Sequence, residues 1–123
     1  MHAAELQIIV TNVRNVLGHV QINVCTEKTF LTDHCPYHGA AVSVVGETVV
    51  KVTVPPGVWA VQAYHDENDN EEVDRDALGI PTEGIGFSNN APFRFGPPSY
   101  HDAKIQLGTE GGKISLRLRY FIS

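Results

Sequence analysis

Long hydrophobic runs and concentrated positive charge are both missing from this sequence. No apolar stretch approaches the roughly 20 residues that a membrane-spanning helix needs. Lys and Arg total 9 against 14 Asp and Glu, and they form no basic patch, which argues against a protein that follows nucleic-acid phosphates. We therefore expect no membrane span and no nucleic-acid partner.

Common catalytic motifs are also missing. The sequence has neither a nucleophile elbow nor an HExxH motif, and the stretch GIPTEGIG lacks the lysine and the following helix of a phosphate-binding loop. His65 and His101 stand at the two ends of a long connection between strand patterns. The ordinary interpretation is a pair of strand-end histidines bonded to loop backbone. The alternative is a metal-dependent hydrolase that uses His65, His101 and nearby loop carboxylates.

Cysteine is scarce: Cys25 and Cys35 are the only two. A disulfide between them would close a loop of about ten residues, stabilise the fold by roughly 2.5–3 kcal/mol and indicate an oxidising compartment. Two unrelated buried thiols are an alternative. A zinc or copper site formed with His34 and His38 is another, although adjacent His34 and Cys35 are awkward ligands for one ion. No basic and apolar leader opens the chain, so either the protein is cytoplasmic or a signal peptide has been removed.

The pattern that dominates the chain is a period of two, which is typical of strands. The chain has 123 residues, the usual size of one domain, and we expect a single β-sandwich domain over residues 1–123 that is a monomer or weak dimer. The predicted fold is all-β, a seven-stranded antiparallel immunoglobulin-like or prealbumin-like sandwich. Its strands are expected at residues 6–10, 20–25, 41–45, 48–54, 58–65, 103–107 and 114–120.

One long ordered loop is expected from Asp66 to Asp102, because this connection far exceeds the usual 2–6 residues. Its second half is rich in glycine, asparagine and aromatic residues. In the simpler interpretation the aromatic side chains pack over the open end of the sandwich. In the functional interpretation they form a ligand surface that stacks on a sugar or holds a peptide. The candidate surface residues are Phe87, Asn89, Asn90 and Arg94.

The first half of this loop concentrates the negative charge. Seven of the 14 acidic residues lie between positions 66 and 76 with Arg75 as the only base, so this segment carries −6 and the rest of the chain +1. Oxygen-bearing side chains fall at alternate positions, as in chains that wrap a hard cation. Glu71 and Ala77 replace the glycine and the final acid of the usual calcium loop, and a solvated acidic turn is the simpler alternative. The candidate Ca²⁺ ligands are Asp66, Asn68, Asn70, Glu72, Asp74 and Asp76.

Several stretches are similar to a bacterial family of unknown function. They are VPPGVWA at 54–60, YHDENDN at 64–70, LGIPTEGIGFSNN at 78–90 and RFGPP at 94–98, and they resemble domain-of-unknown-function family 2141. The resemblance implies a small exported protein, periplasmic or secreted, with no established activity. Asp69 and Glu71 stand where the family commonly has glycine. A more distant similarity is to prealbumin-like and B-type surface-protein sandwiches, in which calcium stiffens a loop.

Together these observations predict a non-catalytic exported β-sandwich. Its acidic loop would bind calcium and order the loop rich in glycine, asparagine and aromatic residues, which would then bind a carbohydrate, a peptide or a protein. A purely structural accessory domain is a further possibility, in which the acidic residues only keep the surface soluble.

Overall fold

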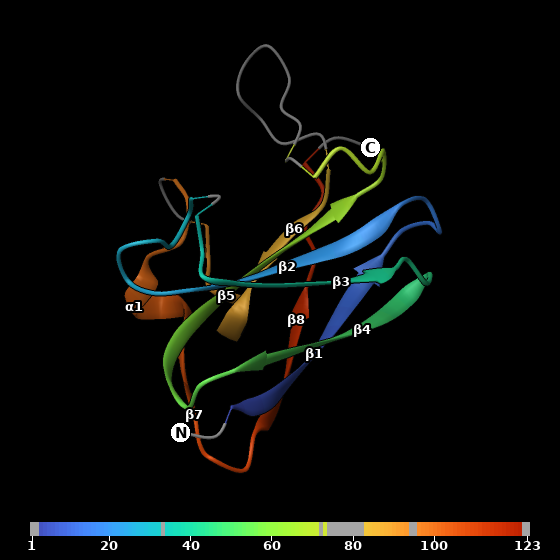
Figure 1. The fold of residues 1–123 in the computed structure, drawn as a ribbon. Coiled ribbons are helices and arrows are strands. Elements are labelled where there is room, and N and C mark those ends of the chain that lie inside the picture. The colour runs from blue at the N-terminus through green and yellow to red at the C-terminus, as the bar shows by residue number, and fades with distance from the viewer. Residues whose placement is uncertain (1–2, 33, 72, 74–82, 94–95, 122–123) are drawn as a thin grey trace.

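The computed structural model describes residues 3–32, 34–71, 73, 83–93 and 96–121, and Figure 1 shows that most of this chain consists of strands. Two short helical turns, η1 (Ser88–Asn90) and α1 (Tyr100–Ala103), lie in the long connection. The strands are β1 (Ala4–Val13), β2 (His19–Cys25), β3 (Tyr37–Val42), β4 (Gly46–Val54), β5 (Gly57–Asp66), β6 (Ile85–Phe87), β7 (Lys104–Leu107) and β8 (Gly112–Arg117).

These strands form two sheets, which confirms the predicted all-β sandwich. One sheet has the order β4-β1-β8 and the other β3-β2-β5-β6, with β7 pairing to the first half of β5. Two details of the prediction are wrong. The described residues contain eight strands rather than seven, because β6 forms inside the expected loop and pairs with β5. The sandwich is also not purely antiparallel, since β1 and β8 run parallel.

The core lies between the sheets and follows from the alternation of side chains along each strand. Leu6, Ile8 and Val10 of β1 are fully buried and lie opposite Val52, Val50 and Thr48 of β4, while the residues between them face outward. A second, smaller cluster packs around the Cys25–Cys35 pair, where Phe30 and Phe87 meet edge to face with ring centroids 5.6 Å apart. This cluster supports the loop at one end of the five-stranded sheet.

The strand expected at 41–45 is displaced toward the N-terminus, to Tyr37–Val42. The Thr48 hydroxyl accepts a hydrogen bond from the Val44 N–H and donates one to the Val44 carbonyl, each 2.9 Å long. These bonds turn the chain from β3 into β4 and leave Val44 and Val45 more than half exposed. The run of hydrophobic residues suggests a strand at 41–45. The hydrogen bonds between Thr48 and Val44 instead place residues 43–45 in a turn.

The Cys25–Cys35 disulfide is present, with Cα atoms 4.6 Å apart. It confirms the predicted pairing and, because it uses both thiols, is incompatible with free thiols and with the zinc or copper interpretation. No helix in the part of the chain described here is long and apolar enough to cross a membrane.

Candidate functional site

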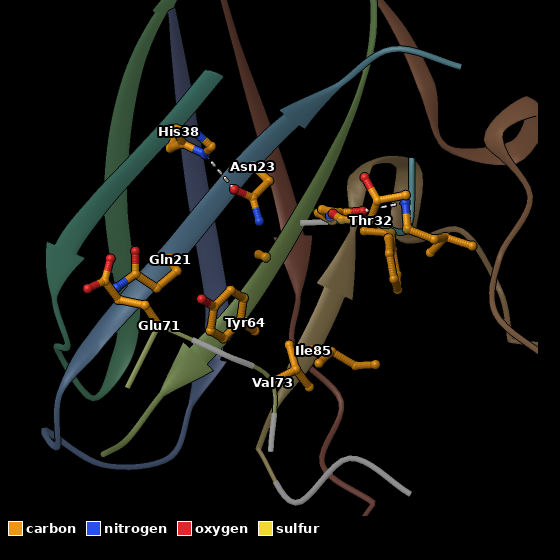
Figure 2. A pocket seen from close by; sticks show the side chains of 12 residues that line it. Gln21, Asn23, Thr32, His38, Tyr64, Glu71, Val73 and Ile85 are labelled. Atoms are coloured by element: carbon orange, nitrogen blue, oxygen red, sulfur yellow. Dashed lines mark hydrogen bonds between the residues drawn. The ribbon is translucent and has the colours of Figure 1, made fainter. Parts of the chain in front are cut away.

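A hollow of about 730 Å³ lies on the outer face of the five-stranded sheet (Figure 2). It forms there because β2 and β5 are neighbours in register, with Gln21 opposite Tyr64 and Asn23 opposite Gln62. Since alternate residues of a strand share a face, these polar side chains all point away from the core. The hollow is lined by Gln21, Asn23, Leu31, Thr32, His38, Gln62, Ala63, Tyr64, Glu71, Val73, Ile85 and Phe87.

One wall of the hollow is the loop that the disulfide closes between β2 and β3. The Gln62 side chain ties this loop to β5: its carbonyl oxygen accepts from the Leu31 N–H at 2.9 Å, and its amide donates to the Thr32 carbonyl at 2.8 Å. The polar atoms of Gln62 are therefore used to hold the wall. The disulfide and this double hydrogen bond fix the loop at two separate points.

Two other amide side chains present groups to the hollow. The Asn23 carbonyl oxygen accepts from His38 Nδ1 at 2.9 Å, and the Gln21 amide donates to an Asp66 carboxylate oxygen at 3.4 Å. Within the described residues, the Asn23 Nδ2 donor and the Gln21 Oε1 acceptor have no hydrogen-bond partner. In Figure 2, Gln21 and Glu71 lie at one end of the hollow and Thr32 at the other. The floor thus offers at least one donor and one acceptor that are open to a ligand.

Apolar side chains complete the lining. Leu31 comes from the disulfide-closed loop, Ile85 and Phe87 from β6, and Val73 from the connection after β5. The Tyr64 ring, from β5, lies in the middle of the hollow in Figure 2. The site therefore combines amide groups, a carboxylate and a flat ring with an apolar rim, which is the composition of many small-molecule sites.

Asp66, the first predicted calcium ligand, is fully buried at the end of β5. Its carboxylate accepts from the backbone N–H of Asn70 at 3.1 Å and of Glu71 at 2.8 Å. The chain takes left-handed conformations at Asp69, with φ of 54°, and at Glu71, with φ of 61°, so both N–H groups can reach back to Asp66. The structure thus gives Asp66 a loop-closing role that needs no metal ion.

Two further acids of the loop have side-chain partners from the β1–β2 region. Glu67 forms a two-point ion pair with Arg14, with an Nη2–Oε1 distance of 2.6 Å, and accepts from the Asn15 amide at 2.5 Å. The hydrogen bond from Arg14 lowers the pKa of Glu67 and raises the pKa of Arg14. Asp69 lies 2.8 Å from His19 Nδ1. Arg14 therefore balances part of the negative charge that suggested a cation.

The other predicted calcium ligands fall into two groups. Asn68 and Asn70 are exposed on the loop. Glu72, Asp74 and Asp76 lie outside the described residues. Among the residues that the structure does describe, no three His, Cys, Asp or Glu side chains are grouped so as to hold a metal ion.

His65 is fully buried and both of its ring nitrogens have partners. Nε2 lies 2.8 Å from the Leu17 carbonyl, which can only accept, so Nε2 carries the proton. Nδ1 lies 3.2 Å from the Tyr120 hydroxyl, and that hydroxyl accepts from the Arg14 N–H at 3.0 Å. Burial raises the pKa of Tyr120, which keeps this hydroxyl neutral. His65 therefore links the end of β5 to the β1–β2 turn through Leu17 and to the segment after β8 through Tyr120.

The structure does not bring His101 to His65. His101 is exposed on α1, three residues before Lys104, which pairs with Ala60 of β5. His65 lies five residues further along β5, about 16 Å for an extended chain. The elements that carry the two histidines therefore meet β5 at well-separated points.

The residues of the predicted ligand surface mainly make contacts within the fold. Phe87 is 6% exposed. The Asn89 amide donates to the carbonyls of Asp102 at 3.1 Å and Lys104 at 2.8 Å, and the Asn90 oxygen accepts from the backbone N–H of Arg117 at 2.8 Å. Arg94 lies outside the described residues.

Sequence reasoning missed the hollow itself. Gln21 and Asn23 alternate with buried Val20 and Ile22, which is the pattern of an ordinary solvent-facing strand. The available signal was the unusual run of amide side chains on that face, joined by Gln62 in a second strand. Only the β2–β5 register shows that they meet.

The fold and site define a class: a disulfide-closed β-sandwich with a concave, amide-rich face on its larger sheet. The chain belongs to the bacterial domain-of-unknown-function family 2141 (DUF2141), described as an uncharacterized protein conserved in bacteria, whose profile matches residues 8–115. This confirms the resemblance seen in the sequence. Comparisons with curated proteins and with solved structures find no significant match.

Proposed function

We propose that this protein is an exported, non-catalytic module that binds a neutral carbohydrate in the hollow on its five-stranded sheet. The observation that carries the proposal is the set of amide groups on that face, with Asn23 Nδ2 and Gln21 Oε1 unpartnered among the described residues. The disulfide supports export, because such bonds persist mainly in oxidising compartments.

The chemistry of a sugar suits this lining. Neighbouring hydroxyl groups both donate and accept hydrogen bonds, and amide side chains offer both functions in one plane. The C–H face of a pyranose can pack against the exposed Leu31 side chain or against Val73. A volume of about 730 Å³ lies within the usual range for ligand pockets and has room for a short oligosaccharide. The wall held by Gln62 is already in place, which limits the ordering cost of binding.

A panel of neutral oligosaccharides, with binding measured by calorimetry, tests the proposal. We expect Asn23→Ala to lower the affinity for the best-binding oligosaccharide about tenfold. This is the effect of losing one hydrogen bond of about 1.4 kcal/mol. Gln21→Ala should weaken it similarly. Gln106→Ala is the matched control, because Gln106 is exposed on β7 of the same sheet and outside the hollow. Absence of binding across the panel, or equal losses in the Gln106 variant, would contradict the proposal.

We also propose that the acidic loop takes up Ca²⁺, on the support of the alternating oxygen positions in its sequence. In this arrangement Asp66 shapes the loop through the Asn70 and Glu71 N–H groups, and Asn68 and Asn70 on the same loop carry side-chain oxygens of the kind that Ca²⁺ binds. A cation that binds only the folded protein raises its melting temperature by mass action. We expect a rise in millimolar CaCl₂ that a chelator reverses. An unchanged melting temperature would refute calcium binding and leave the carbohydrate proposal standing.

A further inference from the structure

A second hollow, of about 340 Å³, lies where β6, an edge strand of the larger sheet, meets β8, an edge strand of the smaller one. Its apolar lining includes Phe87, Ala91 and Phe93, and its polar lining is Asn90, Arg117 and Arg119. Phe87 also lines the larger hollow, so the two share a wall. The second hollow differs from the first in charge, because it contains two guanidinium groups and no acidic residue in its lining.

The two arginines are held toward the same hollow by the strand and its neighbours. Arg117 and Arg119 are two residues apart along an extended segment, so their side chains share a face. The Arg117 N–H donates to the Asn90 side chain at 2.8 Å, and Arg119 exchanges backbone hydrogen bonds with Ile85 of β6. Both backbones are therefore anchored at the rim of the hollow.

The Arg119 guanidinium is also held by aromatic rings. Its central carbon lies 5.3 Å from the ring centroid of Phe93 and 5.6 Å from that of Phe121, and these two rings contact each other edge to face. Such cation–π contacts fix the plane of a guanidinium without satisfying its N–H donors. Within the described residues, neither Arg117 nor Arg119 has a carboxylate partner or a side-chain hydrogen bond. Two guanidinium groups without a carboxylate partner in the described part of the chain therefore share one hollow in a protein of net charge −5, and aromatic rings hold the Arg119 group in place.

The backbone at the rim is unusual as well. Asn89 and Asn90 are consecutive non-glycine residues with positive φ, 61° and 48°. This conformation is costly for most residues, and here the asparagine side chains compensate by bonding to neighbouring backbone groups. It turns the chain at η1 so that Asn90 and Phe93 line the same hollow.

We infer that this second hollow binds a small organic anion, a carboxylate attached to an aromatic or aliphatic body. Guanidinium groups bind carboxylates through paired N–H···O contacts, which Arg117 and Arg119 are placed to supply. The Asn90 amide can add a neutral donor. Phe93 and Ala91 then cover the apolar body of the ligand. The site stands independently of the carbohydrate proposal, because it uses neither Gln21 nor Asn23.

Three probes separate the two parts of this recognition: benzoate has the anion and the ring, inorganic phosphate only the anion, and benzyl alcohol only the ring. We expect benzoate, titrated in 150 mM NaCl and followed by calorimetry or NMR, to bind at least tenfold more tightly than either of the others. Arg117→Gln should lower the affinity for benzoate by at least tenfold. Lys51→Gln is the control, because it removes the same charge from an exposed position on β4.

Arg119→Gln provides a second variant, with a melting curve to show that it remains folded. The inference is overturned if benzoate binds no better than phosphate, or if Arg117→Gln and Lys51→Gln have equal effects. Oligosaccharide binding should be unchanged in Arg117→Gln, so failure of one proposal is distinguishable from failure of the other.

Discussion

At the scale of single residues, His65 and His101 have different roles. His65 is buried between Leu17 and Tyr120, whereas His101 is exposed on α1. We expect His65→Ala to lower the free energy of unfolding by about 2–4 kcal/mol, because it leaves a cavity and removes the partner of two polar groups. His101→Ala should change it by less than about 0.5 kcal/mol. Urea unfolding measures both, and equal effects would contradict the network.

Glu67 makes a pH-dependent contribution to stability. Its pKa is lowered in the folded protein by the Arg14 hydrogen bond, so the stabilisation is present above the unfolded pKa of about 4.3 and is lost as pH falls through the lower folded value. We expect Glu67→Gln to cost about 1 kcal/mol at pH 7 and progressively less toward pH 3. Glu27→Gln, at an exposed position, is the control in the same urea titrations. A cost that stays constant with pH would show that the ion pair does not contribute.

At the scale of elements, the turn between β1 and β2 is held tightly against the end of β5. Gly18 has φ of +60°, and a Cβ there would lie 1.9 Å from the Asp66 carbonyl oxygen. Gly46, the first residue of β4 after the β3–β4 turn, also has positive φ, but nothing lies within 4 Å of a Cβ. The two turns therefore form a matched pair that separates steric clash from backbone strain.

We expect Gly18→Ala to lower the free energy of unfolding by about 3 kcal/mol or more. Gly46→Ala should cost only about 1 kcal/mol, the usual penalty for a left-handed alanine. Thermal or urea unfolding of the two variants gives the comparison. Equal losses would mean that the turn does not pack on Asp66 as described.

At the scale of the whole molecule, the buried core can be predicted from the sequence better than the candidate site can. Alternation along β1 and β4 predicts which side chains are buried, because that pattern is local. The parallel pairing of β1 with β8 joins segments more than 100 residues apart, and no local pattern encodes it. The role of Asp66 was also hidden, because its spacing to Asn68 and Asn70 suits a cation as well as it suits backbone N–H groups.

The larger hollow also depends on contacts between distant parts of the chain that no local pattern predicts. Gln21 and Gln62 lie 41 positions apart in the chain and are indistinguishable from solvent-facing residues until the β2–β5 register places them on one concave face. The disulfide was predictable from spacing, and it closes the loop that forms one wall. The candidate site is thus assembled from individually ordinary residues by tertiary pairing.

The most direct test of the carbohydrate proposal is chemical-shift mapping of isotope-labelled protein titrated with the best-binding oligosaccharide. We expect the largest shifts at the side-chain amides of Gln21 and Asn23 and at the backbone of Tyr64, with little change at Gln106. Shifts confined to other faces of the molecule, with Gln21 and Asn23 unmoved at saturation, would contradict the proposal.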